Sequence, residues 1–368
     1  MHVAILIGHF PPGSFGGAEL QAEGWAKRLA DRHRVTVITR RDPATQPARE
    51  ERDGFAVVRL AVSRVPVWRT AADVLQIRRA IARLAPRPDV LLCFQTFVSG
   101  LAGVLAGRAL GIPAIVWIRG EGEYRLDQGA AQRWLAPRVW AAAGEVLVQS
   151  PQNQVELLQR LERSDASRVA RVRSRLHVVP NGLHLPAWSP ALGSSVLSVG
   201  RLIADKGMDV LVDAAAIANL PVVIAGEGPQ CDALQARAKR AGVACRFEGF
   251  ASRERLAELY REAACVVLAA RRGEGLPNVL LEAMAHGRAV VATPCAGARD
   301  LLVDGVNSLV IPADDVPALA TALRRLASDR PLAERLALAG RRSVERFAWD
   351  AVRPRLEEAL ERCVRGAG

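Results

Sequence analysis

The chain has 368 residues, of which half are hydrophobic, 24% are charged and 5% are aromatic, with 30 glycines and 21 prolines. This length is enough for two domains of ordinary size, and the composition is typical of a compact α/β protein and excludes a disordered chain. The formal net charge is +12, and residues 1–183 carry most of it, with 26 basic against 16 acidic residues. The six cysteines lack C-x-x-C spacing, which predicts reduced thiols and neither a metal site nor a disulfide framework.

The uneven charge predicts an anionic partner for the first half of the chain. Candidates are an acidic membrane surface and an anionic acceptor, with nucleic acid less favoured. The alternative is a chain that uses arginine freely, because lysine occurs only at Lys27, Lys206 and Lys239. The N-terminal run MHVAILIGHF has no basic leader, so we expect no signal peptide and a cytoplasmic location, with possible association with the inner membrane face.

Strand and helix patterns alternate along the first half, which predicts a doubly wound parallel sheet. Apolar strand candidates lie at residues 2–8, 35–39, 55–60, 90–94, 114–118 and 145–148. The turn after the first strand contains Gly16 and Gly17, where a ligand could approach the backbone closely. It is not the G-x-G-x-x-G turn of dinucleotide-binding proteins, which argues against a nicotinamide-dependent oxidoreductase.

Two features of this half bear on membranes. Residues 90–107 hold no charge, but their glycines and polar residues favour a strand, a helix from 99 to 110 and a further strand over a membrane span. Trp68, Trp134 and Trp140 stand among arginines, a pattern that suits either a membrane interface or helices packed on a sheet.

The composition changes after Pro180, Asn181 and Gly182, where a stretch rich in Pro, Ser and Gly predicts a domain boundary. We expect a first domain at 1–183 and a second at 184–349, with a last amphipathic helix at about 350–368 that could pack on the first domain. Strand candidates in the second half are 196–199, 222–225, 245–248, 265–268, 289–292 and 308–311. Two Rossmann-like halves would leave a cleft between their carboxyl edges, where such sheets bind ligands.

Cationic and glycine-rich loops follow the first two strands of the second half. Arg201 comes directly after Gly200, and Lys206 lies just beyond. A guanidinium beside an ammonium suits a diphosphate, although a solvated charged turn is the alternative. Gly226 and Gly228 form a narrow turn that should face the same cleft.

The stretch from 271 to 291 combines a charged loop, a helix at 278–286 and a buried strand. Pro277 suits the first helical turn and Asn278 could cap it, so the first amides should point into the loop and attract phosphate. Glu274 and Glu282 would repel a phosphate, which suggests that they bind sugar or ribose hydroxyls. The alternative is an amphipathic helix with solvated glutamates.

Together these motifs resemble the family-4 retaining glycosyltransferases of GT-B fold, also called group 1. The resemblance rests on GGAE at 16–19, PNG at 180–182, VGRL and KG within 199–207, AGEGP at 225–229 and EGLPNVLLEAM at 274–284. It implies two Rossmann-like domains facing each other across a cleft. It also implies retaining transfer of a sugar from a nucleotide-sugar donor, with no metal and no cofactor.

The resemblance also implies roles for individual residues. Arg201 and Lys206 would hold the donor diphosphate, and Glu274 would meet the donor sugar. Glu282 would bind the ribose hydroxyls, and Gly17 would approach the diphosphate. The full donor-binding set is Gly16, Gly17, Gly200, Gly226, Gly228, Gly275, Leu276, Pro277, Asn278, Val279 and Glu282.

Arg119 departs from the family pattern, because many relatives have a His-Gly pair after the strand at 114–118. Arginine cannot serve as a base at ordinary pH, so we expect Arg119 to orient an anionic or hydroxylated acceptor. The acceptor would be a glycan or a lipid-linked group in envelope or extracellular polysaccharide synthesis. A non-catalytic nucleotide-sugar-binding subunit is the alternative function.

Overall fold

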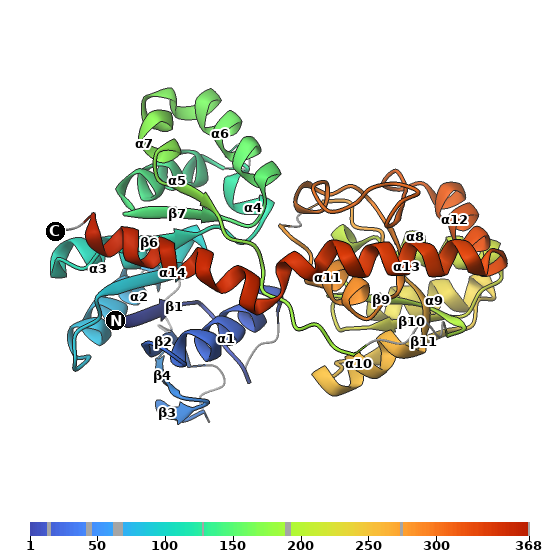
Figure 1. Ribbon diagram of the computed structural model, residues 1–368, viewed down its shortest axis with the longest axis horizontal. Helices are drawn as coiled ribbons and strands as arrows, with labels where there is room; N and C mark the ends of the chain where they lie inside the picture. Colours follow the sequence, from blue (N-terminus) through green and yellow to red (C-terminus); the bar gives the residue numbers. More distant parts are fainter. Residues whose placement is uncertain are drawn as a thin grey trace. The chain divides into compact units, whose positions relative to one another are not determined.

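The computed structural model describes residues 1–12, 16–41, 46–61, 69–126, 129–187, 193–272 and 275–366. The chain forms two compact units, which are Met1–Gly182 with Trp349–Gly368, and Leu183–Ala348 (Figure 1). Each unit has a mainly parallel β-sheet with helices on both faces. The prediction of an α/β fold with two Rossmann-like sheets is confirmed.

The first unit is built on an eight-stranded sheet in the order β3-β4-β2-β1-β5-β6-β7-β8. Every neighbouring pair is parallel except β3 and β4, which pair antiparallel at one edge. The inner strands are apolar because helices cover both of their faces. The strands are β1 (His2–Leu6), β2 (Arg34–Arg40), β3 (Arg49–Arg52), β4 (Phe55–Leu60), β5 (Val90–Phe94), β6 (Ala114–Trp117), β7 (Glu145–Val148) and β8 (Leu176–Val178).

Two helices from opposite ends of the chain share one face of this sheet. Helix α14 (Trp349–Arg365) buries residues at intervals of three and four, so its apolar stripe packs beside α1 (Gly17–Ala30). The Trp349 ring lies 5.0 Å from that of Trp25. The other helices are α2 (Arg69–Ala82), α3 (Leu101–Leu110), α4 (Glu121–Tyr124), α5 (Ala130–Ala142), α6 (Pro151–Asp165) and α7 (Val169–Arg173).

The second unit has a six-stranded parallel sheet in the order β11-β10-β9-β12-β13-β14. Its strands are β9 (Ser195–Val199), β10 (Val222–Ala225), β11 (Cys245–Gly249), β12 (Ala263–Leu268), β13 (Ala289–Ala292) and β14 (Leu309–Val310). Helices α8 (Met208–Ala218), α9 (Cys231–Ala241), α12 (Val316–Ser328) and α13 (Arg330–Val344) contribute to the core on one face. Helices α10 (Arg253–Glu262) and α11 (Asn278–Ala285) contribute to the core on the other.

The uncharged stretch that begins at residue 90 forms strand β5 and helix α3, as the sequence predicts. The helix begins at Leu101 rather than at residue 99, because Thr96–Gly100 form a wide turn in which Val98 has a φ of 57°. Within the described ranges, no helix has both the length and the apolar character needed to cross a bilayer.

Candidate active site

The cationic loop of the second unit starts at the centre of its sheet. Strand β9 lies between β10 and β12, so the loops that follow these three parallel strands begin side by side. The Gly200 amide donates to the carbonyl oxygen of Ala225 at 2.9 Å, and the Leu202 amide donates to that of Glu227 at 2.8 Å. The structure therefore brings the loops of Arg201, Gly226 and Gly228 together at one sheet edge.

The two glycines of the narrow turn are required by this close approach of loops. A Cβ atom at Gly226 would lie 2.0 Å from the carbonyl oxygen of Gly200, and one at Gly228 would lie 2.4 Å from that of Leu202. Their φ angles, +139° and +159°, are also ones that side chains rarely allow. Packing between the two loops is therefore enough to explain why glycine is required at both positions, and ligand binding is not needed to explain it.

Lys206 ends a short 3-10 turn, Ala204–Lys206, just before α8. Gly207 follows it with a φ of +64° and lies against the carbonyl oxygen of Ala269. Burial lowers the pKa of Lys206 to about 8, and repulsion from Arg201, whose side chain is exposed, adds to the effect. A bound anion would relieve this penalty, because it stabilises the charged ammonium.

Two arginines that follow β12 hold the Lys206 loop in place. The Arg271 amide donates to the carbonyl oxygen of Asp205, and its guanidinium binds both carboxylate oxygens of Asp209 at 2.9 and 2.8 Å. Arg272 pairs with the Asp205 carboxylate at 3.0 Å. From the sequence these arginines were expected only to carry charge in a loop. The acidic residues on either side of Lys206, Asp205 and Asp209, were the signal for their structural role.

Helix α11 begins at Asn278, after Pro277 in extended backbone with a ψ of 118°. The prediction that Asn278 caps the helix is therefore wrong, because Pro277 is the N-cap residue and Asn278 is the first helical residue. Gly275, Leu276 and Pro277 are buried, whereas Asn278 and Val279 are partly exposed. Glu274, expected to meet the donor sugar, lies outside the described residues.

Glu282 lies in α11 and is partly exposed. Its Oε2 atom accepts a hydrogen bond from the Tyr260 hydroxyl at 2.9 Å. Burial of the carboxyl group raises the pKa of Glu282. The hydrogen bond from Tyr260 and the charge of Arg253 oppose that rise. Sequence reasoning missed Tyr260, because nothing local links it to a residue 22 positions away.

Gly16 and Gly17 lie in the first unit at the start of α1. A Cβ atom at Gly16 would lie 2.3 Å from the Oε2 atom of Glu19, so this glycine makes room for a carboxylate at the start of the helix. Such a carboxylate interacts favourably with the helix dipole. Gly17 is exposed. Glu19 therefore gives the GGAE motif a structural role that the sequence analysis did not recognise.

Arg119 follows β6 and is only 9% exposed. Its guanidinium lies 4.7 Å from the Trp117 ring centroid and donates to the Asn181 side-chain oxygen at 2.6 Å. Its Nε and Nη1 atoms are buried without a hydrogen-bond partner in the described part of the chain. Burial lowers the pKa of Arg119 to about 9, against the attraction of Glu123 and Glu19. The contact with Asn181 gives the PNG motif a structural role.

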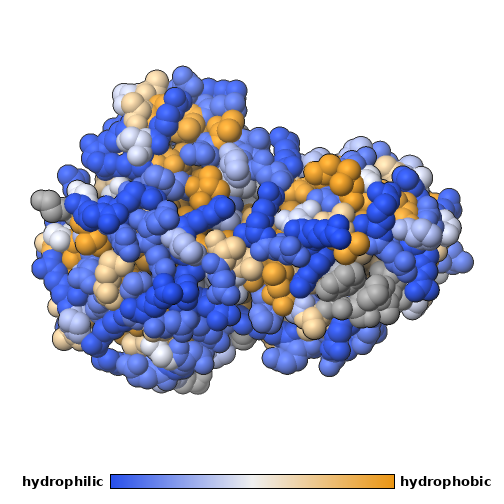
Figure 2. Space-filling view, in the orientation of Figure 1, coloured by the Kyte–Doolittle hydropathy of each residue, from blue (hydrophilic) through white to orange (hydrophobic). Residues whose placement is uncertain are grey.

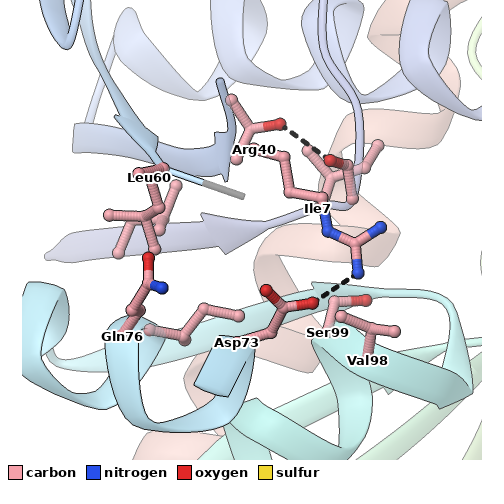
Figure 3. Close-up of a pocket in the computed structure, with 12 residues that line it drawn as sticks. Ile7, Arg40, Leu60, Asp73, Gln76, Val98 and Ser99 are labelled. Carbon is pink, nitrogen blue, oxygen red and sulfur yellow. Dashed lines mark hydrogen bonds and ion pairs between the residues drawn. The ribbon is translucent and has the colours of Figure 1, made fainter. Parts of the chain in front are cut away.

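A small pocket in the first unit lies where β1, β2 and β4 end (Figure 3). Arg40 and Asp73 form an ion pair of 2.6 Å there, and Asp73 is 5% exposed. Apolar side chains make up much of the wall: Ile7, Ile38, Leu60, Ile77 and Val98. Apolar walls around a paired charge suit a ligand with both hydroxyl groups and an apolar face.

The tryptophans expected at a membrane interface differ in position. Trp134 is 60% exposed, with the Arg138 guanidinium 4.0 Å from its ring centroid. Trp140 is fully buried and donates to the Thr96 hydroxyl, so the interfacial interpretation is wrong for this residue. Trp68 lies outside the described residues. The face shown in Figure 2 is largely hydrophilic, with hydrophobic residues in separate groups.

The described side chains offer no evident metal site. In the parts of the chain that the structure describes, no three His, Cys, Asp or Glu residues are grouped so that they could hold a metal ion. In the loop after β9, Arg201 and Lys206 lie near Asp205 and Asp209, whose carboxylates pair with Arg272 and Arg271.

Two family models together match most of the chain. Residues 16–182 match the family described as glycosyl transferase 4-like domain. Residues 193–329 match the family described as glycosyl transferases group 1. These matches fall in the first and second units respectively.

Known proteins agree with this assignment. D-inositol 3-phosphate glycosyltransferase of Xylanimonas cellulosilytica is 31% identical over 293 residues, which are 69% of this chain and 67% of that enzyme. Other curated relatives are matched over about half of their own length. Sucrose-phosphate synthase from Thermosynechococcus elongatus has a TM-score of 0.85 at 20% identity over all of both chains.

Another similar structure is Anabaena HepE in complex with UDP-glucose, with a TM-score of 0.80 at 20% identity over 98% of this chain and 99% of that one. At this level of identity, both structures report on the fold alone. The family matches and the 31% identical relative show that the chain belongs to the group 1 glycosyltransferases, and the similar structures show that it has the GT-B fold.

Proposed function

We propose that the protein is a retaining glycosyltransferase that moves a sugar from a nucleotide-diphosphate sugar to a glycan or lipid-linked acceptor. The observation that carries the proposal is the cationic loop with Arg201 and Lys206 at the centre of the second sheet, where the pKa of Lys206 is lowered. Relatives named for transfer reactions and a similar structure in complex with UDP-glucose support it. They give no support to the non-catalytic alternative.

Charge at the leaving group is the proposed basis of catalysis. Negative charge grows on the diphosphate as the glycosidic bond breaks, so donors already in place stabilise the transition state more than the ground state. Arg201 and Lys206 would supply two cations. The first amides of α11, among them those of Asn278 and Val279, would supply further donors. This arrangement would not require a metal ion.

The acceptor side is assigned to the first unit. Arg119 is buried and already bonded to Asn181, so we expect it to shape the acceptor site and to act on the acceptor through its charge. The pocket with Arg40 and Asp73 offers a carboxylate and a guanidinium to hydroxyl groups of an acceptor. A relative named for D-inositol 3-phosphate is consistent with a hydroxylated, anionic acceptor.

We also propose a role in envelope or extracellular polysaccharide synthesis, in the cytoplasm at the inner face of the membrane. The basic first half and exposed Trp134 beside Arg138 support contact with anionic lipid. Vesicles with anionic lipid should retain the protein at low salt and release it at high salt. Equal retention by neutral vesicles, or no retention at all, would contradict the membrane contact.

The direct test is turnover with a panel of nucleotide sugars, measured as nucleoside diphosphate release with and without candidate acceptors. Lys206→Ala and Glu282→Ala should abolish most of that release, whereas Lys239→Ala, which removes an exposed lysine in α9, should leave it unchanged. Unchanged release in the first two variants would show that the site is wrongly assigned. Tight donor binding without turnover for any acceptor would instead favour the non-catalytic alternative.

A further inference from the structure

We propose that Tyr260 is a positioning residue for the donor, whose hydroxyl holds one oxygen of Glu282 so that the other oxygen can accept ribose hydroxyls. This inference rests on the proposed function, in which Glu282 binds the ribose. It assigns a second residue to ribose recognition, although Tyr260 lies in a different helix from Glu282.

The two oxygen atoms of the Glu282 carboxylate differ in their surroundings. Tyr260 is 1% exposed in α10, and its hydroxyl donates to the Oε2 atom of Glu282 at 2.9 Å. Among the described residues, the Oε1 atom of Glu282 has no hydrogen-bond partner, and the Glu282 residue is partly exposed. A carboxylate with one oxygen fixed and the other accessible is arranged to accept a hydrogen bond from a ligand hydroxyl.

The ring of Tyr260 is itself held in place by His286. The ring of His286 stacks on Tyr260 with centroids 4.9 Å apart and planes 22° apart. The Nδ1 atom of His286 lies 2.8 Å from the backbone carbonyl oxygen of Glu282, so a proton on Nδ1 makes a hydrogen bond there. Burial lowers the pKa of His286, which favours its neutral form. The three residues therefore form one connected cluster at the end of α11.

The charge on Glu282 matters because a carboxylate accepts a stronger hydrogen bond from a hydroxyl than a carboxylic acid does. Burial raises the pKa of Glu282 and so favours the carboxylic acid. The Tyr260 hydroxyl and the charge of Arg253 lower that pKa. The charges of Arg261, Arg288 and Arg341 lower the pKa of the neighbouring His286. Loss of the Tyr260 hydroxyl should therefore raise the pKa of Glu282. As the pH falls, the variant should then lose ribose binding at a higher pH than the wild type does.

The experiment compares two probes by calorimetry, which are the nucleoside diphosphate that binds the wild type best and its 2′,3′-dideoxy counterpart. Tyr260→Phe should weaken binding of the ribose form by about 3- to 10-fold, because Glu282 loses the hydrogen bond that orients its carboxylate, and should leave the dideoxy form unchanged. The matched control is Tyr124→Phe, which removes the other buried tyrosine hydroxyl, hydrogen-bonded to Asn153 at 2.9 Å in the first unit. That control should change neither probe.

A second arm follows the ribose preference from pH 8 to pH 5. In Tyr260→Phe the preference should disappear at a higher pH than in the wild type, a shift that a purely structural role would not cause. If Tyr260→Phe proves unstable, His286→Phe keeps the ring stack while removing the hydrogen bond to the carbonyl oxygen, and should reduce the ribose preference less. The inference is overturned if Tyr260→Phe keeps the wild-type preference and pH profile. Failure of the wild type to bind any nucleoside diphosphate would instead refute the proposed function.

Discussion

Arg119 and Lys206 are two cations in comparable places, each after an inner strand of a mainly parallel sheet. Burial lowers the pKa of both, yet their surroundings differ. The Arg119 guanidinium lies near the Phe94 and Trp117 rings and donates to Asn181, whereas Lys206 is partly exposed and is repelled by the charge of the exposed Arg201. The sequence predicts that Lys206 holds a diphosphate and that Arg119 orients an acceptor. We propose that Lys206 contacts the donor, whereas the buried Arg119 also stabilises the fold through Asn181.

The largest expected effect comes from removing the cation at Lys206. Lys206→Met should lower the rate of donor cleavage by about 10²- to 10³-fold, the usual cost of one group that stabilises a growing negative charge. Thermal stability should not fall, because the substitution removes a charge that burial disfavours. Rates come from nucleoside diphosphate release and stability from thermal unfolding, and a normal rate would remove Lys206 from the site.

Substitution of Arg119 by methionine should lower stability and leave donor affinity nearly unchanged. Arg119→Met removes the charged hydrogen bond to the Asn181 side-chain oxygen, which Gln149 also donates to, so we expect a loss of stability of about 1–3 kcal/mol. Affinity for nucleoside diphosphates, measured by calorimetry, should stay within a few-fold of the wild type. If this variant instead loses as much donor affinity as Lys206→Met, the contrast between the two cations is wrong.

Substitutions of the two arginines that hold the Lys206 loop should weaken nucleoside diphosphate binding by smaller and unequal amounts. Arg271→Ala removes a bidentate pair with Asp209 and should weaken nucleoside diphosphate binding by about 3- to 10-fold through a loosened loop. Arg272→Ala removes an exposed pair with Asp205 and should change binding less than about twofold. Equal losses in both variants would mean that charge near the loop matters more than its geometry.

The sequence predicted most strands well, because buried parallel strands are continuous apolar runs bounded by glycine and proline. Strands β4, β5, β7, β10 and β13 have the predicted bounds. Strand β3 was missed because its residues, REER, have no apolar pattern and lie at a sheet edge. The start of α11 was misplaced by one residue, because composition alone does not give the extended backbone of Pro277.

Contacts between distant residues were not predictable from the sequence. The Arg119–Asn181 and Arg271–Asp209 bonds each join residues 62 positions apart. The different exposure of Trp134 and Trp140 was within reach, because residues six positions apart on a helix point roughly 120° apart. Motifs thus located the cationic loops, whereas tertiary structure was needed to separate charges available to a ligand from charges that hold the fold.

The central claim, that Lys206 meets a diphosphate, can be tested by counting protons taken up on binding. The pKa of Lys206 is about 8 in the free protein, and a bound anion should raise it, so affinity should fall as the pH rises above that value. Calorimetric titration with a nucleoside diphosphate near pH 8, in two buffers of different ionisation enthalpy, should show uptake of about half a proton. Lys206→Arg should bind without that uptake, and wild-type binding with no proton uptake would contradict the account.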